Sequence, residues 1–70
     1  MRYRATHFWS MRLGCEASRV SLQDKHGGEH FAIIPQDDSG PANRRRIYET
    51  LDVLEAHIKA GNDPGEVSFD

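Results

Sequence analysis

The feature that most constrains the fold is a change in the spacing of apolar residues between Pro35 and Pro41. Before Pro35 the apolar side chains tend to alternate with polar ones, which is the period of a β-strand. After Pro41 they recur every three or four residues, which is the period of an amphipathic helix. The chain is therefore expected to consist of strands followed by one helix, an α+β arrangement.

The first predicted strand covers residues 2–13. Its odd positions are mostly apolar and its even positions mostly polar, with Phe8 as the one apolar residue on the polar side. We expect the odd positions, Tyr3 and Trp9 among them, to face the core, and the even positions to face solvent. A helix over this segment would gather Phe8, Trp9 and Arg12 on one face; it fits the alternation less well but stays an alternative.

Two further strands are expected before Pro35. Residues 14–18 are predicted to form a turn, and residues 19–23 alternate again. Residues 24–28 include two adjacent glycines and have the composition of a hairpin turn, which the β-rich run 29–34 follows. Pro35 lacks the N–H group that a strand ladder needs, so the third strand should end there.

The helix is predicted to begin near Pro41, because proline is favoured in the first helical turn, and to end at Gly61. A single stripe at i, i+4, i+7 and i+11 would bury against the sheet, and it consists of Ile47, Leu51, Leu54 and Ile58. The prediction is one domain over residues 1–61, a three-stranded antiparallel sheet (β-β-β) with the helix packed on one face. Residues 62–70 would form a turn and a short C-terminal tail that either frays or adds a short strand.

Composition limits the classes of protein to which the chain can belong. With 37% hydrophobic and 29% charged residues it is too apolar for a disordered segment, so it should fold. Its longest apolar run, Phe31 to Ile34, is far shorter than the roughly 20 residues of a membrane-spanning helix, so no membrane association is expected. Cys15 is the only cysteine, which excludes an internal disulfide and favours a cytoplasmic protein. A compact domain of this kind would suit a phage or a mobile element.

No motif in the sequence predicts catalysis, a cofactor or a metal. Residues 26–30 read His-Gly-Gly-Glu-His, which matches the letters of an inverted zinc-protease motif. That chemistry needs a helix to bring both imidazoles onto one face, and two adjacent glycines favour a turn instead. His26 and His30 are therefore interpreted as polar turn and strand residues, and the chain is not expected to be an enzyme.

Arginine-rich segments are the candidate partner-binding sites. Near the N-terminus, arginines interleave with aromatic residues, although on a strand only Phe8 would share their face. Three consecutive arginines near the start of the helix oppose its dipole, and pairing with Glu49 would relieve this only in part. The predicted partner-binding residues are Arg2, Arg4, Phe8, Arg12, Arg44, Arg45 and Arg46.

Two functions follow from these features. The first is a small non-enzymatic protein-binding module, a regulator or inhibitor that docks by its sheet edge or by the arginine corner at residues 44–46; a homodimer is compatible with it. The second is a DNA- or RNA-binding domain that uses the arginine-bearing face of the sheet. The order of elements resembles that of plant AP2 domains and of the arm-binding domains of some phage integrases, and this resemblance implies a sheet laid in the major groove. Residues 31–70 carry four basic and eight acidic residues, which opposes binding to phosphates.

Overall fold

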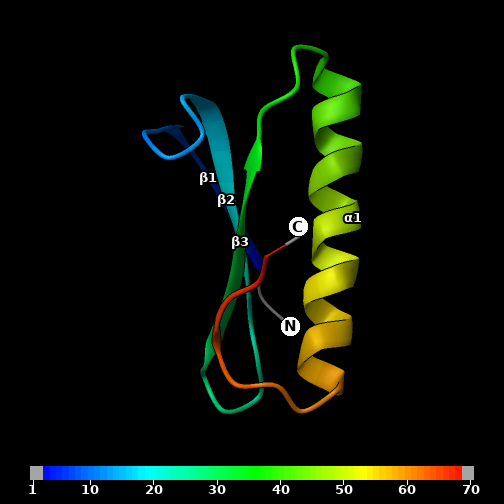
Figure 1. Cartoon of the computed structure of the whole chain (residues 1–70). Helices are drawn as coiled ribbons and strands as arrows, with labels where there is room; N and C mark the ends of the chain where they lie inside the picture. The colour runs from blue at the N-terminus through cyan, green and yellow to red at the C-terminus, as the bar shows by residue number, and fades with distance from the viewer. Residues whose placement is uncertain (1–2, 69–70) are drawn as a thin grey trace.

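The computed structural model describes residues 3–68 and shows an α+β fold in which a twisted sheet lies against one helix (Figure 1). The elements in chain order are β1 (Tyr3–Ser10), β2 (Cys15–Gln23), β3 (Glu29–Pro35), α1 (Gly40–Lys59) and β4 (Gly65–Glu66). The sheet order is β1-β2-β3-β4, and β1, β2 and β3 are antiparallel neighbours. The expected sheet with one helix is confirmed, but a fourth short strand, β4, runs parallel to β3.

The first turn lies earlier than the sequence predicts. It spans residues 11–14, and β2 begins at Cys15 instead of Arg19. Gly14 ends the turn with a φ of 68°, a conformation that suits glycine because it has no Cβ, and its N–H donates to the carbonyl oxygen of Ser10 at 2.8 Å. Gly14 is therefore the last residue of the turn, whereas the sequence predicted it as the first residue of a turn over residues 14–18.

The second turn lies where the sequence predicts it. The Oδ1 atom of Asp24 accepts hydrogen bonds from the backbone N–H groups of His26, at 2.9 Å, and Gly28, at 2.8 Å. A Cβ atom added at Gly28 would clash with the ring of Pro64 and would lie 2.8 Å from Asp24 Oδ2. The glycine thus allows the segment that follows the helix to approach the hairpin closely.

Helix α1 has the start and the end that the sequence predicts to within a residue or two. Ser39 is the N-cap, and its hydroxyl oxygen accepts from the N–H of Ala42 at 3.4 Å, while Pro41 lies in the first turn. The helix ends at Lys59, and Gly61 follows with a φ of 81°. The predicted interval for the helix is therefore confirmed.

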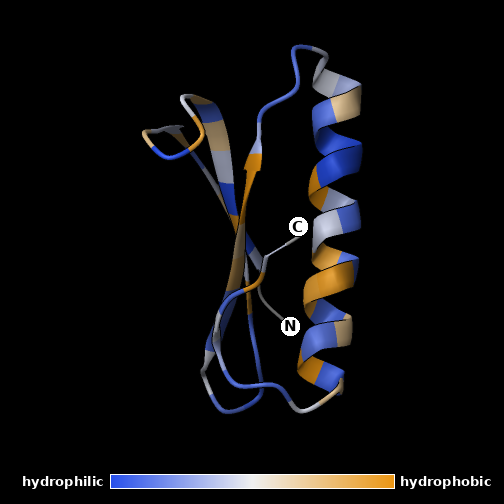
Figure 2. Cartoon of the chain, in the orientation of Figure 1, coloured by the Kyte–Doolittle hydropathy of each residue, from blue (hydrophilic) through white to orange (hydrophobic). Residues whose placement is uncertain are grey.

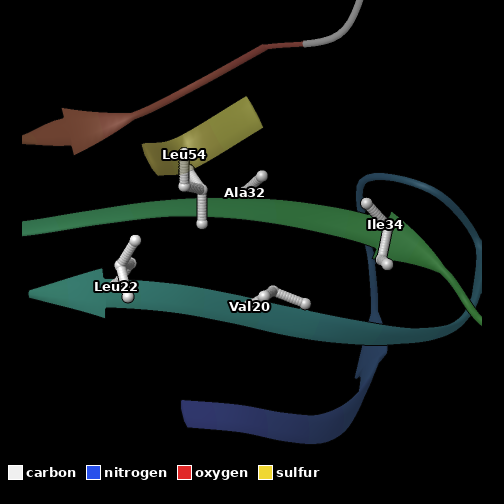
Figure 3. Close-up of a cluster of buried hydrophobic side chains, with 5 residues drawn as sticks. All are labelled: Val20, Leu22, Ala32, Ile34 and Leu54. Carbon is white, nitrogen blue, oxygen red and sulfur yellow. The ribbon is translucent and has the colours of Figure 1, made fainter. Parts of the chain in front are cut away.

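The core lies between α1 and the two middle strands. Its buried side chains are Val20 and Leu22 from β2, Ala32 and Ile34 from β3, and Leu54 from α1 (Figure 3). The other members of the predicted stripe, Ile47, Leu51 and Ile58, are partly buried against this cluster. Figure 2 shows the apolar residues of α1 on the side that faces the sheet. Burial of a Leu side chain contributes about 1.5–3 kcal/mol, so Leu54 is a principal contact between helix and sheet.

Candidate protein-docking surface

Strand β1 forms one edge of the sheet, and half of its backbone hydrogen-bonding groups face away from β2. The backbone N–H of Gln36 donates to the carbonyl oxygen of Glu16 at 2.9 Å, and the backbone N–H of Asp24 donates to the carbonyl oxygen of Gly28 at 2.8 Å. The backbone groups of even-numbered residues in β2 therefore bond toward β3. Hydrogen-bonded and non-bonded pairs alternate in antiparallel sheets, so the odd-numbered residues of β2 bond toward β1. With Ser10 opposite Cys15, even positions of β1 bond to β2 and odd positions present N–H and C=O groups at the open edge.

The side chains at the odd positions of β1 point to the face of the sheet that carries α1, because Tyr3 lies opposite Leu22 and Ala5 opposite Val20. That part of the prediction is correct. They do not fill the core, however, because α1 packs against β2 and β3 and leaves β1 uncovered. Tyr3 is 56% exposed and Trp9 57% exposed, so the prediction that these rings are core residues is wrong.

The result is an open surface, here called the β1 edge surface and defined by Tyr3, Ala5, His7 and Trp9. All four residues are exposed. The Nε2 atom of His7 lies 2.8 Å from a carboxylate oxygen of Glu16 on the neighbouring strand. Two aromatic rings therefore stand beside a row of free backbone donors and acceptors.

The opposite face of the sheet carries Arg4 and Arg19, while Arg12 lies in the turn that follows β1. Acidic residues lie close to Arg19 and to Arg12. Arg19 pairs with Glu29 at 2.7 Å and stacks over the ring of Phe31 at 4.2 Å. Arg12 pairs with Glu66 at 2.7 Å, which joins the first turn to β4. Hydrogen bonds from Arg19 and Arg12 lower the pKa values of Glu29 and Glu66, respectively, below their usual range. The pair with Glu29 reduces the positive potential of this face, and the pair with Glu66 reduces it at the turn.

The remaining predicted residues of this face have different surroundings. Arg4 is exposed, and its charge also helps to lower the pKa of Glu29. Phe8 is half-buried and lies opposite Ala17 on β2. Arg2 lies outside the described residues. The structure therefore brings Arg4 close to an acidic residue and leaves only part of the Phe8 ring accessible.

The arginine corner of residues 44–46 lies in the first half of α1, the helix that packs against β2 and β3. All three side chains are exposed, and Arg46 donates to the carbonyl oxygen of Pro35 at 3.4 Å. Within residues 3–68 no ion pair joins this corner to Glu49. Arg46 and Arg12 line the same cleft of about 730 Å³, together with the carboxylates of Glu49 and Glu66. The cleft is therefore of mixed charge.

A buried polar network joins the second hairpin to the end of α1. His30 is 0% exposed; its Nε2 atom lies 3.0 Å from Asp24 Oδ2, and its Nδ1 atom lies 3.1 Å from Nδ1 of His57. The pKa of Asp24 is lowered, first by the hydrogen bond with His30 and then by the N–H of Gly28. The side chain of His26 is exposed in the turn, and only its backbone N–H reaches this network, at Asp24 Oδ1. Because His30 has no contact with solvent, its ring serves to link the hairpin, β3 and α1.

The sequence did not reveal three of these features. Nothing in the local pattern around Glu66 predicts its pairing with Arg12, because the two residues are 54 positions apart. His57 lies three residues after Leu54 and so shares the helix face of the apolar stripe. This spacing is the one signal that could have placed His57 toward the sheet. The exposure of Tyr3 and Trp9 depends on the width of the helix, which no pattern in β1 encodes.

Searches of protein-family models, curated proteins and solved structures find no match to this chain. Within residues 3–68 no helix is both long enough and apolar enough to cross a bilayer. The same residues contain no group of three or more His, Cys, Asp or Glu side chains arranged to hold a metal ion.

Proposed function

We propose that this chain is a non-enzymatic protein-binding module that docks through the β1 edge surface. The observation that carries the proposal is the combination of an open strand edge with the exposed rings of Tyr3 and Trp9. An extended segment of a partner can add to such an edge by main-chain hydrogen bonds, while side-chain contacts provide specificity. Tyr and Trp, together with Arg, are the residue types enriched among those that dominate binding energy at interfaces.

Strand β1 lacks the devices that usually protect an edge. Natural edge strands avoid unwanted pairing by being very short, by carrying lysine or proline, or by containing a bulge. The sequence of β1 contains neither lysine nor proline, and its pairing with β2 runs without a bulge from Tyr3 to Ser10. Arg4 is its one residue of fixed charge, and that side chain lies on the face opposite the β1 edge surface. An edge with these properties is suited to binding.

Nucleic-acid binding by the outer face has less support. Two of the arginines that would contact phosphates, Arg12 and Arg19, are paired with carboxylates. Binding to nucleic acid gains much of its free energy from unpaired basic groups that displace counterions. A face on which carboxylates accompany the arginines gains little from that effect.

The proposal is tested by capture on the immobilised chain from a lysate of the source cell, with and without nuclease. The decisive variant is Ala5→Pro, which removes an edge-facing N–H but no hydrogen bond to β2, and edge strands tolerate proline. Val53→Ser is the matched control, because it removes an exposed apolar side chain that lines the cleft. Arg44→Glu with Arg45→Glu tests the arginine corner in parallel.

We expect one protein to be retained in stoichiometric amount by the wild type and by Val53→Ser, with or without nuclease, and to be lost with Ala5→Pro. Circular dichroism of each variant shows that the fold is intact. Retention that depends on the two corner arginines and not on Ala5 would contradict docking by the β1 edge surface. Retention that disappears on nuclease treatment would favour the nucleic-acid function instead.

A further inference from the structure

We infer that the partner of the β1 edge surface is a second copy of this chain, paired with it through antiparallel β1 strands about a two-fold axis at Thr6. This inference rests on the proposed function and names the partner of the same surface. Identical strands that pair in this way make an isologous interface, in which one surface must be complementary to itself. Strand β1 can be tested for that property residue by residue.

The backbone geometry restricts the register. Only odd positions of β1 have N–H and C=O groups at the open edge, so hydrogen-bonded pairs must join odd residues to odd residues. A two-fold axis at Thr6 pairs Tyr3 with Trp9 of the second copy and Ala5 with His7 of the second copy. An axis at Ala5 would pair Tyr3 with His7 of the second copy and leave the ring of Trp9 without an aromatic partner, and one at His7 would place Tyr3 opposite the turn. The register at Thr6 is the one that uses the whole strand.

The side chains are complementary in this register. On the face that carries α1, the ring of Tyr3 lies beside the ring of Trp9 from the second copy, and cross-strand aromatic pairs of this kind stabilise sheets. On the outer face, Arg4 lies opposite Phe8 of the second copy, so the two Arg4 side chains do not oppose each other. The same pairing of charge and ring already occurs within one chain, where Arg19 lies 4.2 Å above Phe31.

The area is sufficient for a specific dimer. A buried aromatic side chain covers about 150–250 Å², so four rings that are each about half exposed contribute roughly 300–500 Å². The paired backbones and the other side chains of the two strands bring the total to the order of 1,000 Å², the size at which specific interfaces begin.

A two-fold axis perpendicular to the sheet keeps both helices on the same face. The four rings would then lie in the trough between the two copies of α1.

Two measurements on the purified chain test the inference. Sedimentation equilibrium should give twice the mass of one chain for the wild type and for Val53→Ser. Ala5→Pro should weaken self-association about tenfold or more, because the symmetric interface loses a hydrogen-bond donor twice. A second edge variant, Ala5→Lys, should act in the same direction by introducing like charges, and it guards against a failure of Ala5→Pro to fold.

Cross-linking tests the register itself. In a Cys15→Ser background, Thr6→Cys places two thiols in a non-hydrogen-bonded pair at the two-fold axis, where Cα atoms lie about 4.5 Å apart, within disulfide range. Arg4→Cys is the matched control, because it lies on the same strand face but about 13 Å from its own copy in this register. Oxidation by diamide should yield covalent dimer from Thr6→Cys and little from Arg4→Cys.

The outcomes separate this inference from the proposed function. A wild-type chain that stays monomeric, or equal cross-linking of the two cysteine variants, overturns pairing of two copies at Thr6. If that monomer still captures another protein in an Ala5→Pro-sensitive manner, the docking function holds and only the identity of the partner is wrong. A monomer that captures no protein overturns both.

Discussion

The Nδ1 atom of His30 lies 3.1 Å from the Nδ1 atom of His57, which ties the start of β3 to the last turn of α1. A hydrogen bond between two identical ring atoms requires that one carries a proton and the other does not. The second nitrogen of His30 contacts Asp24, so both of its polar atoms have partners although the side chain is fully buried. The network therefore links a turn, a strand and a helix through one ring.

Removal of His57 should leave a buried polar atom without a partner. We expect His57→Ala to lower the free energy of unfolding by about 1–3 kcal/mol, the usual cost of an unsatisfied buried group. His26→Ala is the control, because His26 is exposed and its backbone N–H still donates to Asp24 in that variant. Urea unfolding followed by circular dichroism measures both. Equal stability of the two variants would show that the histidine contact contributes nothing.

The lowered pKa of Asp24 predicts a pH dependence of stability. A carboxyl group whose pKa is lower in the folded state stabilises the fold at pH values above its unfolded pKa, near the ordinary value of 3.8. That contribution is lost as the pH falls through the still lower pKa of the folded state. Asp24→Asn cannot titrate, so its stability deficit relative to the wild type should shrink between pH 5 and about pH 3. A deficit that stays constant over this range would contradict the prediction.

Two glycine substitutions should have different effects on the free energy of unfolding. Gly28→Ala places a Cβ against Pro64 and Asp24, and we expect a loss of about 1–3 kcal/mol in unfolding free energy, as for other overpacked sites. Gly40→Ala places a Cβ at the first residue of α1, where no heavy atom beyond its chain neighbours and the helix's own backbone lies within 4 Å. Alanine reduces the entropy of the unfolded chain, but Pro41 disfavours helical backbone at a preceding residue that has a Cβ, so the net change in unfolding free energy should be smaller than for Gly28→Ala. Thermal unfolding of both variants provides the comparison, and a similar loss in each would exclude a specific contact at Gly28.

The ion pair between Arg12 and Glu66 should contribute little to stability. Both side chains are partly exposed, at 61% and 37%, and exposed pairs are usually worth about 0.2–1 kcal/mol. A double-mutant cycle with Arg12→Ala and Glu66→Ala should yield a coupling energy in that range, which decreases as salt is raised. A coupling that is insensitive to salt would indicate that packing, and not charge, joins the turn to β4.

Much of the fold could be predicted because its signals are local. The change of period at Pro35, the turn at residues 24–28 and the cap at Ser39 each depend on a few neighbouring residues. Strand β4 was expected only as one of two alternatives for residues 62–70, because its two residues form a strand only by pairing with His30 and Phe31 after the chain has crossed over. So short a segment has no periodicity of its own.

The sequence pattern predicted how the side chains of β1 face but not the candidate site itself, because none of the predicted partner-binding residues belongs to the β1 edge surface. The alternation in β1 correctly indicates which side chains share a face, but it cannot indicate whether another element covers that face. An α-helix is about 10–12 Å wide and strands lie about 4.8 Å apart, so one helix covers about two strands. Helix α1 covers β2 and β3, and Tyr3 and Trp9 therefore stay exposed. A chain with one helix and three long strands must leave one strand uncovered.

The short strand β4 also limits how far such sheets can grow. It occupies the side of β3 that would otherwise accept a further strand, at His30 and Phe31, and Val67 N–H donates to Phe31 just beyond it at 2.7 Å. Pro35, at the other end of β3, has no N–H group to offer. The two borders of the sheet are therefore unequal. If two copies pair through β1 as proposed, each uses the more open border of its sheet, so association by this route would stop at two molecules instead of continuing into fibres.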